Sequence, residues 1–480
     1  MKTKQCIIAF LSLCCMSINA QTMEPLIIEG QITNSTEPRL YIPIQLEYGL
    51  FHLDTISLDQ NGYFHYTTDK VTFPQKTNLR NKDTQLNDFF IAPGYHLEIT
   101  GNGTDFRTLL KTAKIKGAES NRYKMLHDSI MVVRKDMTNW YELKGDSLLE
   151  YITAQKHFTD SREKVVFDKV ETTDPYLSHF GRMTYLDNQF LRLYFLLAGV
   201  SMDLLDERKA WSFATGIADK TILEDPFNDE YMISNNYKNW FLTQYIGYLQ
   251  NKDFQNNPAL KEKKNYRLEK IDREFKGEIR EYMLFKRLEA MLATHIRTIE
   301  QLNEFNPIME QYVSAFTNGK YEQFLQDLFR EKEERLQVTE KGKVAPGFTL
   351  KNDKGETYSL ADFRGKVVYL DLWASWCGPC RQEMPALREI YEKYKNDDRI
   401  AIIGIAVHDG YNRWIKALEE DKPEWLQLHD ADGLVARAYE ANVIPRYILI
   451  DKNGNIADMH ASSPSNKETL ENKFREEMSK

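Results

Sequence analysis

The sequence predicts a multidomain protein with an N-terminal antiparallel β-sandwich, a central all-α segment and a C-terminal α/β domain. A chain of 480 residues exceeds the usual size of a single domain. The pattern of apolar residues also changes twice, from strict alternation to a spacing of three and four residues, and then to strands that alternate with helices. We expect these domains over residues 21–117, 118–337 and 338–480, after a leader of residues 1–20.

Residues 1–20 have the layout of a secretory signal peptide. Two lysines precede an apolar run of residues 6–16, and the small residue Ala20 follows. Because this run is too short to span a bilayer, we expect cleavage after Ala20 and export to the periplasm or cell envelope. A lipid anchor on Cys14 or Cys15 is the alternative, although neither cysteine follows a small residue.

Charge and cysteine content narrow the possible functions. The formal net charge is −8, and it would be −10 without the leader, which holds two lysines and no acid. An acidic chain without a basic run is poorly suited to binding nucleic acid. After cleavage the chain would keep two of its five cysteines, Cys377 and Cys380. A disulfide between them would close a very small loop and add little stability, so the pair indicates reactivity.

The β-domain is predicted from short segments that alternate polar and apolar residues and are rich in β-branched or aromatic side chains. These segments are residues 26–32, 39–47, 51–58, 62–68 and 95–100. Turn pairs such as Asn61-Gly62 and Pro93-Gly94 separate them. A small antiparallel sandwich is the expected result.

The central segment carries apolar residues at helical spacing with charged residues between them, for example over residues 123–137 and 275–292. Asp225-Pro226 and Asn306-Pro307 are expected to mark helix boundaries. The most apolar run, residues 190–200, contains Arg192 and is expected to form a core helix, not a membrane span.

The C-terminal domain alternates strands and helices. Residues 367–374 and 400–407 are nearly continuous apolar runs, as expected of strands buried on both faces. Residues 380–395 form an amphipathic helix pattern, and residues 447–460 predict a hairpin. The sequence "CGPC" at 377–380 therefore lies where a strand ends and a helix begins, and the unpaired amides of a helix N-terminus lower the pKa of a thiol.

These residues resemble the thioredoxin superfamily, and within it the TlpA/ResA-like extracytoplasmic thiol-disulfide oxidoreductases. The resemblance covers residues 344–479 and rests on "APGFTL", "GKVVYLDLWASWCGPCRQEMPAL" and "VIPRYILIDKNGNI". Upstream, "DTISLDQNGYF", "FIAPGYHLEIT" and "IKGAESNRY" resemble a β-domain of unknown function that often precedes such reductases. The resemblance implies a thioredoxin fold for residues 338–480.

The resemblance also implies roles for individual residues. Cys377 matches the attacking cysteine and Cys380 the resolving cysteine, and the two would form a reversible disulfide. Asp371 matches the buried acid that relays protons to the resolving sulfur, and Glu383 matches an acid that tunes the thiols. Their simpler interpretations are a solvated aspartate and an ordinary first-turn helix acid. The residues that would face a substrate chain are Trp376, Gly378, Pro379, Ile444 and the cis-proline Pro445.

We therefore expect an exported thiol-disulfide oxidoreductase that reduces or isomerises protein disulfides. Its expected partners are disulfide-bearing client proteins and a membrane dithiol that donates electrons, and no cofactor is expected. The Gly-Pro pair between the cysteines is that of thioredoxin, whose potential is about −270 mV, which favours a reductant. Two alternatives stay open: a scaffold whose redox pair serves one docked client, and a thiol peroxidase. A thiol peroxidase of the peroxiredoxin type requires a proline and a threonine or serine before its attacking cysteine, but this chain has Leu372 and Ala374 at those positions.

A metal site is not expected. His408, Asp409, His429 and Asp430 lie in predicted loops of the C-terminal domain, but no His-x-x-x-His motif or second cysteine pair accompanies them. We expect these four residues on the surface.

Overall fold

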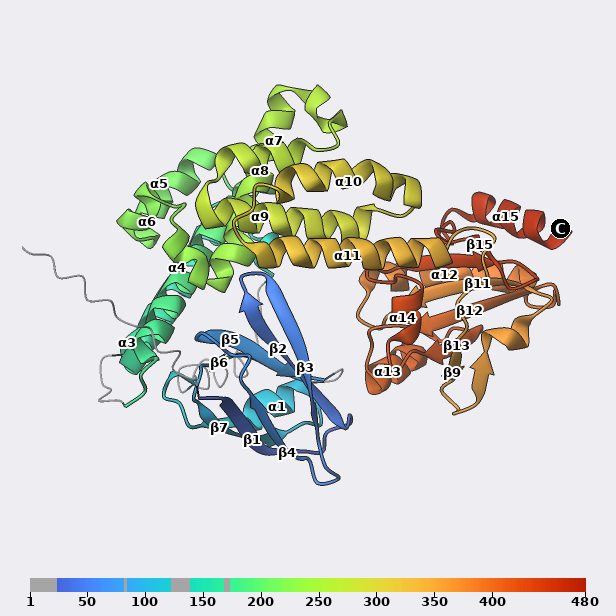
Figure 1. Ribbon diagram of the computed structural model, residues 1–480, viewed down its shortest axis with the longest axis horizontal. Coiled ribbons are helices and arrows are strands. Elements are labelled where there is room, and N and C mark those ends of the chain that lie inside the picture. The colour runs from blue at the N-terminus through green and yellow to red at the C-terminus, as the bar shows by residue number, and fades with distance from the viewer. Residues whose placement is uncertain (1–23, 82–83, 122–138, 168–172) are drawn as a thin grey trace, which may run out of the picture.

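The computed structural model describes residues 24–81, 84–121, 139–167 and 173–480, with the side chains of 162–167 excepted. The expected signal peptide, the possible lipid-anchor cysteines and the helix predicted over residues 123–137 lie outside these residues. Figure 1 shows an N-terminal part of strands, a helical middle and a C-terminal part of strands and helices. The predicted multidomain order of β, α and α/β parts is thus confirmed at this level.

The N-terminal part contains two four-stranded sheets, in the orders β4-β1-β7-β8 and β3-β2-β5-β6. Their elements are β1 (Leu26–Thr33), β2 (Arg39–Glu47), β3 (Leu50–Ser57), β4 (Tyr63–Thr68), β5 (Gln75–Arg80), β6 (Gln85–Ile91), β7 (His96–Asn102), α1 (Phe106–Thr112) and β8 (Lys114–Lys116). Buried side chains of both sheets belong to one hydrophobic core. The expectation of purely antiparallel sheets is wrong, because β1 and β7 run parallel. Strands β2 to β6 lie between β1 and β7 in the chain, and this long connection allows β1 and β7 to run in the same direction.

The first described element of the helical part is the 3-10 helix η1 (Trp140–Glu142). The part is built mainly from long amphipathic helices around a large aromatic and aliphatic core. The helices are α3 (Asp146–Phe167), α4 (Leu177–Ser201), α5 (Glu207–Ile217), α6 (Lys220–Glu224), α7 (Leu242–Asn256), α8 (Tyr266–Glu274), α9 (Gly277–Ala290), α10 (Ile299–Val313) and α11 (Gly319–Val338). Short 3-10 or π-helical turns are η2 (Asp229–Ile233), η3 (Tyr237–Phe241), η4 (Pro258–Glu262) and η5 (Met291–His295). Within the described residues, no helix has the length and apolar character needed to cross a bilayer.

Two expectations about prolines have different outcomes. Asp225 is the C-cap of α6, so the boundary predicted at Asp225-Pro226 is confirmed. Pro307 instead lies inside α10, and the boundary predicted there is wrong. Phe305 and Met309, on either side of the proline, are buried in the helical core. Their packing outweighs the local cost of a proline in a helix.

The C-terminal part is a seven-stranded sheet in the order β10-β9-β13-β12-β11-β14-β15, with accompanying helices. Its elements are β9 (Thr349–Lys351), β10 (Thr357–Ser359), η6 (Leu360–Phe363), β11 (Val367–Trp373), α12 (Gly378–Tyr394), β12 (Ile400–Ala406), α13 (Tyr411–Asp421), β13 (Leu426–His429), α14 (Leu434–Ala438), β14 (Arg446–Ile450), β15 (Ile456–Asp458) and α15 (Lys467–Ser479). Strands β11, β12 and β13 are parallel, and β14 is antiparallel to β11. Every residue of β11 is buried, as its apolar sequence predicted.

Helix α11 connects the helical part to both of the others (Figure 1). At its beginning, Lys320 forms an ion pair with Glu47 at 2.7 Å, and the Tyr321 hydroxyl donates to the backbone oxygen of Tyr48 at 2.6 Å. Near its end, Lys332 Nζ lies 2.9 Å from Glu440 Oε2 of the C-terminal part. The side chains of Lys332 and Glu440 are only 6% and 7% exposed. Because little water reaches either charge, each charge depends on the other for its stabilisation.

The first prediction concerns this buried ion pair. Replacing Glu440 with Gln leaves the Lys332 ammonium group buried without its partner, which typically costs about 3–5 kcal/mol. We expect a loss of this size in the free energy of unfolding of the full chain, measured by denaturant titration with tryptophan fluorescence. The matched control is Glu476→Gln, which removes an exposed partner of Lys473 and Lys480 and should cost less than about 1 kcal/mol. Equal effects of the two substitutions would show that the Lys332–Glu440 pair does not stabilise the interface.

Candidate active site

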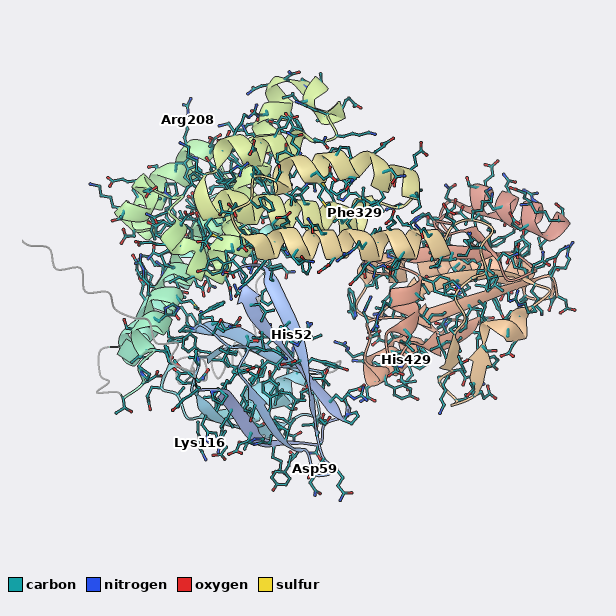
Figure 2. The ribbon with its side chains drawn as sticks, in the orientation of Figure 1. His52, Asp59, Lys116, Arg208, Phe329 and His429 are labelled. Atoms are coloured by element: carbon teal, nitrogen blue, oxygen red, sulfur yellow. A yellow bond between two sulfur atoms is a disulfide. The ribbon has the colours of Figure 1, made fainter. Side chains whose placement is uncertain are left out.

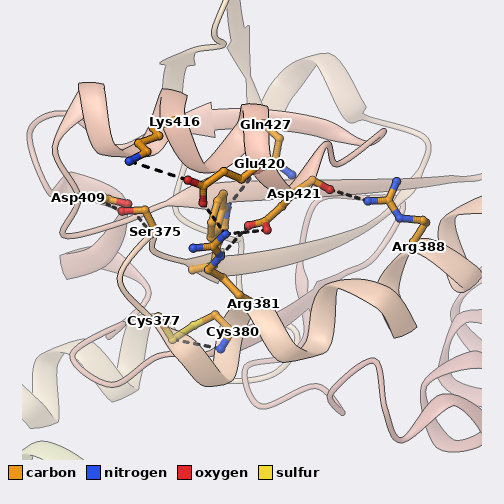
Figure 3. A network of polar contacts seen from close by, with 11 residues as sticks. Ser375, Cys377, Cys380, Arg381, Arg388, Asp409, Lys416, Glu420, Asp421 and Gln427 are labelled. Carbon is orange, nitrogen blue, oxygen red and sulfur yellow. Dashed lines mark hydrogen bonds and ion pairs between the residues drawn. A yellow bond between two sulfur atoms is a disulfide. The ribbon is translucent and has the colours of Figure 1, made fainter. Parts of the chain in front are cut away.

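The two cysteines lie at the junction between β11 and α12, where the sequence analysis expected them. Cys377 is the N-cap of α12, and Cys380 lies one turn into the helix. Their sulfurs form a disulfide, and the two Cα atoms are 5.3 Å apart (Figure 3). Cys377 is 4% exposed and Cys380 is 2% exposed, so the pair is buried against the core of this domain. The predicted pairing of Cys377 with Cys380 is therefore present in the structure.

The first turn of α12 provides an electrostatic environment that favours a thiolate at Cys377. The backbone N–H of Cys380 donates to Cys377 Sγ at 3.2 Å, as a helix amide does to an N-cap acceptor. Pro379 occupies the first turn, where its missing N–H leaves no hydrogen bond unmade. The remaining free amides and the helix dipole favour negative charge at this position.

Asp371 lies on β11 and is 4% exposed. It pairs in the sheet with Gly404 on one side and Tyr447 on the other. Burial, followed by the smaller effect of the negative charge of Glu383, raises the pKa of its carboxyl from 3.8 to about 7. Among the described residues, no hydrogen bond to the carboxylate offsets these two effects. Asp371 can therefore exchange a proton near neutral pH.

Glu383 is the sixth residue of α12 and is partly exposed, so the simpler interpretation as a first-turn helix acid is wrong. Its two carboxylate oxygens accept hydrogen bonds from the backbone N–H and the hydroxyl of Ser465, both at 2.8 Å. Ser465 lies in the loop before α15, 82 residues further along the chain. The sequence analysis did not predict this contact, because nothing in the local pattern around Ser465 indicates a partner so distant in sequence.

The predicted substrate-facing residues lie at the start of α12 or in the loop before β14. Trp376 is 57% exposed, and its indole N–H donates to the backbone oxygen of His408 at 3.1 Å. Gly378 and Pro379 are exposed on the first turn of α12. The Ile444–Pro445 peptide bond is cis, as the motif predicted. Ile444 packs against the same core cluster that contains both cysteines.

The expectation that four loop residues lie on the surface is wrong for three of them. Asp409 is fully buried, and its carboxylate accepts hydrogen bonds from the backbone N–H and the hydroxyl of Ser375. His429, labelled in Figure 2, stacks on a buried tryptophan ring and bonds to the backbone oxygen of Asp409. Asp430 is 1% exposed and accepts the backbone N–H of Ala436 at 2.8 Å. The two aspartates accept backbone N–H groups in buried loops, whereas His429, predicted in a loop, is the last residue of β13. The sequence alone reveals neither arrangement.

A metal site was not expected, and no group of three or more potential ligands occurs among the residues that the structure describes. His408 Nε2 is within 2.9 Å of the backbone oxygen of Ala441, so it also has a structural partner.

An arginine directly after the second cysteine fixes α12 against α13, and the sequence analysis did not single it out. Arg381 forms ion pairs with Asp421 at 2.7 Å and with Glu420 at 2.9 Å (Figure 3). Two turns further along α12, Arg388 donates to the backbone oxygen of Asp421 at 2.7 Å. The spacing of Arg381 and Arg388 on one predicted helix is visible in the sequence. The acidic partners of Arg381, however, lie some 40 residues further along the chain, so the sequence does not indicate them. The first turn of α12 is thus held from outside as well as by its own hydrogen bonds.

The second prediction follows from the pKa of Asp371. Because the folded protein raises this pKa from 3.8 to about 7, it binds the proton more tightly than the unfolded chain does. The stabilisation is complete below about pH 4 and is lost as the pH rises through about 7. In the oxidised protein, the unfolding free energy of Asp371→Asn relative to the wild type should therefore increase by up to ~4 kcal/mol between about pH 4 and 7, and then level off.

Denaturant titrations at a series of pH values test this dependence. Asp397→Asn is the control, because the hydrogen bonds from Arg399 lower the pKa of Asp397 to about 2. Its relative unfolding free energy should not change between about pH 5 and 8. A flat profile for Asp371→Asn over the same range would mean that the Asp371 pKa is not raised.

Comparisons with known proteins agree with this geometry. The Redoxin family model matches residues 340–473. The thiol-disulfide oxidoreductase ResA of Bacillus thuringiensis subsp. konkukian is 33% identical over 128 residues, which cover 26% of this chain and 70% of that protein. The thioredoxin-like protein YneN of Bacillus subtilis is 32% identical over 130 residues, which cover 27% of this chain and 76% of that protein.

A solved structure of a thiol-disulfide oxidoreductase from Bacteroides fragilis is 32% identical and matches with a TM-score of 0.26, covering 28% of this chain and 98% of that one. The ResA match spans more than two thirds of its relative at over 30% identity, and the resemblance of residues 344–479 to ResA-like oxidoreductases is confirmed. The chain therefore belongs to the thioredoxin superfamily as a ResA-like thiol-disulfide oxidoreductase.

Proposed function

We propose that this enzyme is an exported reductase of protein disulfides, with Cys377 as the nucleophile and Cys380 as the resolving thiol. The observation that carries the proposal is the Cys377–Cys380 disulfide at the start of α12, in a domain whose Ile444–Pro445 bond is cis. A disulfide between two cysteines three residues apart opens and closes without refolding the chain, which suits a redox cycle better than a structural role.

In the first step, the thiolate of reduced Cys377 attacks one sulfur of a client disulfide. The client S–S bond breaks, a mixed disulfide forms between Cys377 and the client, and the other client sulfur leaves as a thiolate. The backbone N–H of Cys380, which lies 3.2 Å from Cys377 Sγ in the oxidised form, supports the thiolate before the attack. The exposed Trp376, Gly378 and Pro379 are the surface that the client then contacts.

In the second step, Cys380 attacks Cys377 Sγ and releases the client as a second thiolate. The enzyme disulfide forms again, so the client gains two electrons and the enzyme loses two. Cys380 must lose its proton for this attack, and we assign the acceptance of that proton to Asp371. A carboxyl with a pKa of about 7 is suited to proton transfer near neutral pH. Glu383, held by Ser465, adds negative charge near the thiols and disfavours their thiolate forms.

The cis peptide at Ile444–Pro445 is proposed to present backbone groups to an extended client chain. Clients would be proteins with accessible disulfides in the periplasm or cell envelope, reached through the signal peptide predicted over residues 1–20. Because that compartment is oxidising, repeated reduction needs an electron supply, and we propose a membrane dithiol as the donor.

The third prediction tests the direction of electron flow. On the basis of Gly378-Pro379, the equilibrium potential of the Cys377–Cys380 pair should be closer to that of thioredoxin, about −270 mV, than to that of DsbA, about −120 mV. A titration of the full chain in glutathione buffers, followed by alkylation and mass analysis, gives this value. A potential above about −150 mV would reject the reductase in favour of an oxidase. Cys377→Ser and Cys380→Ser variants, which cannot form the disulfide, are the controls for the mass assignment.

The fourth prediction tests the proton relay. Asp371→Asn should slow release of the client from the mixed disulfide by about tenfold to a hundredfold, because general-base assistance is worth at least that much. The first attack by Cys377 should change little. Rapid-quench measurements on a disulfide peptide separate the two steps, and Asp397→Asn is the matched surface control. If release is equally fast in Asp371→Asn and in the wild type, Asp371 is a structural residue only.

A further inference from the structure

A pocket of about 160 Å³ lies between the helical part and the C-terminal domain, at the cis-proline loop. Arg297 and Lys332 line it from the helical part. Pro445, Arg446 and His460 line it from the C-terminal domain. The residues upstream of the thioredoxin fold thus form one wall of a site that begins at the proline proposed to contact the client. We call this site the interdomain pocket.

The acidic side chain in this pocket is already paired. Glu440 Oε2 accepts from Lys332 Nζ at 2.9 Å. Glu440 Oε1 is 3.8 Å from Arg335 Nε and accepts no hydrogen bond among the described residues, and the charge of Glu440 also acts on Arg446. Arg297 and Arg446 also line the pocket, but neither forms an ion pair with any residue that the structure describes. Arg446 Nε is buried and has no hydrogen-bond partner among these residues. Among the described residues, the pocket therefore has two arginines without an ion pair, and the buried Nε of Arg446 lacks a hydrogen-bond acceptor.

The pKa of His460 reflects the positive charge of the pocket. Burial and the positive charges of Arg446, Arg297 and Lys332 together lower the pKa of its imidazole to about 4, against an opposing effect of Asp458. His460 is therefore neutral at neutral pH and adds no charge of its own. The unbalanced positive charge of the pocket comes from the two arginines.

The size and chemistry of the pocket fit a carboxylate on a short aliphatic stem. A cavity needs only about 10–15 Å³ of this kind of volume to hold one water, so 160 Å³ has room for an acidic side chain. Guanidinium groups bind carboxylates through paired, charge-assisted hydrogen bonds. Burying an arginine Nε without a hydrogen-bond partner is costly. A ligand that accepts a hydrogen bond from this Nε removes the cost, and this favours its binding.

We propose that the interdomain pocket binds an aspartate or glutamate side chain of the client, close in sequence to the cysteine that Cys377 attacks. This inference rests on the proposed function, because it places the client chain along Ile444–Pro445. An extended chain bound there passes the mouth of the pocket, which Pro445 and Arg446 line. The helical part then contributes to client selection through Arg297, although it has no part in the redox chemistry.

Two disulfide peptides that differ only in Glu or Gln beside the cysteines test this inference. The reduced full chain is mixed with each peptide, and the second-order rate of reduction is divided by the rate with dithiothreitol to remove intrinsic differences in reactivity. The ratio of the two normalised rates is the selectivity. The chain has a net charge of −8, so general electrostatics predicts a ratio below one. The pocket predicts a ratio of about three to ten in favour of Glu.

Arg297→Met and Arg446→Met should each bring this ratio to about one or below. Arg297 is exposed, so its substitution keeps the test valid even if Arg446→Met folds poorly. Arg208→Met is the matched control and should keep the full ratio, because Arg208 is an exposed arginine of α5 far from the C-terminal domain (Figure 2).

The two proposals fail in different ways. If the wild type reduces neither peptide, the reductase function is rejected and the client pocket with it. If it reduces both peptides at equal normalised rates, the reductase function stands and the pocket does not bind a carboxylate. A preference for Glu that survives both arginine substitutions would also overturn the inference.

Discussion

The arrangement of the site depends on one constraint, which is that the first turn of α12 begins directly after the buried strand β11. Trp373 at the strand end donates its indole N–H to Gln427 at 3.0 Å, and its backbone oxygen accepts from Val407. The turn that follows is fixed by Asp409, which accepts two hydrogen bonds from Ser375. These contacts fix where the helix N-terminus lies. Cys377 therefore occupies the N-cap position, where negative charge is most favoured.

The same strand contains a group that makes the fold less stable than it could be. Asp371 is buried between Gly404 and Tyr447 without a hydrogen bond from the described residues, and its pKa rises to about 7 as a result. An apolar or amide side chain would avoid this cost at neutral pH. Buried acids with a raised pKa are typical of functional sites, and the proton transfer proposed for Asp371 would use this property. Glu383, the second acid near the pair, is held in place by Ser465.

Local patterns in the sequence predicted the elements around the disulfide, because a buried strand, a helix N-cap and a proline step each leave a signal within a few residues. Contacts between distant residues leave no such signal. The Lys332–Glu440 ion pair joins residues 108 apart, and nothing near either one indicates the other. The buried roles of Asp409 and Asp430 were missed for the same reason, since loop composition alone suggests a solvated residue. Pro307 shows the opposite case, in which tertiary packing overrides a clear local signal.

The most direct test of the account is the order and pH dependence of thiol alkylation in the reduced full chain. Mass analysis after brief treatment with iodoacetamide, over a range of pH values, identifies which cysteine reacts and at what pKa. The helix N-terminus predicts that Cys377 reacts first, with a pKa clearly below the ordinary cysteine value of about 8.5. Reaction at Cys380 first, or a Cys377 pKa at or above about 8.5, would contradict the claim that α12 activates Cys377.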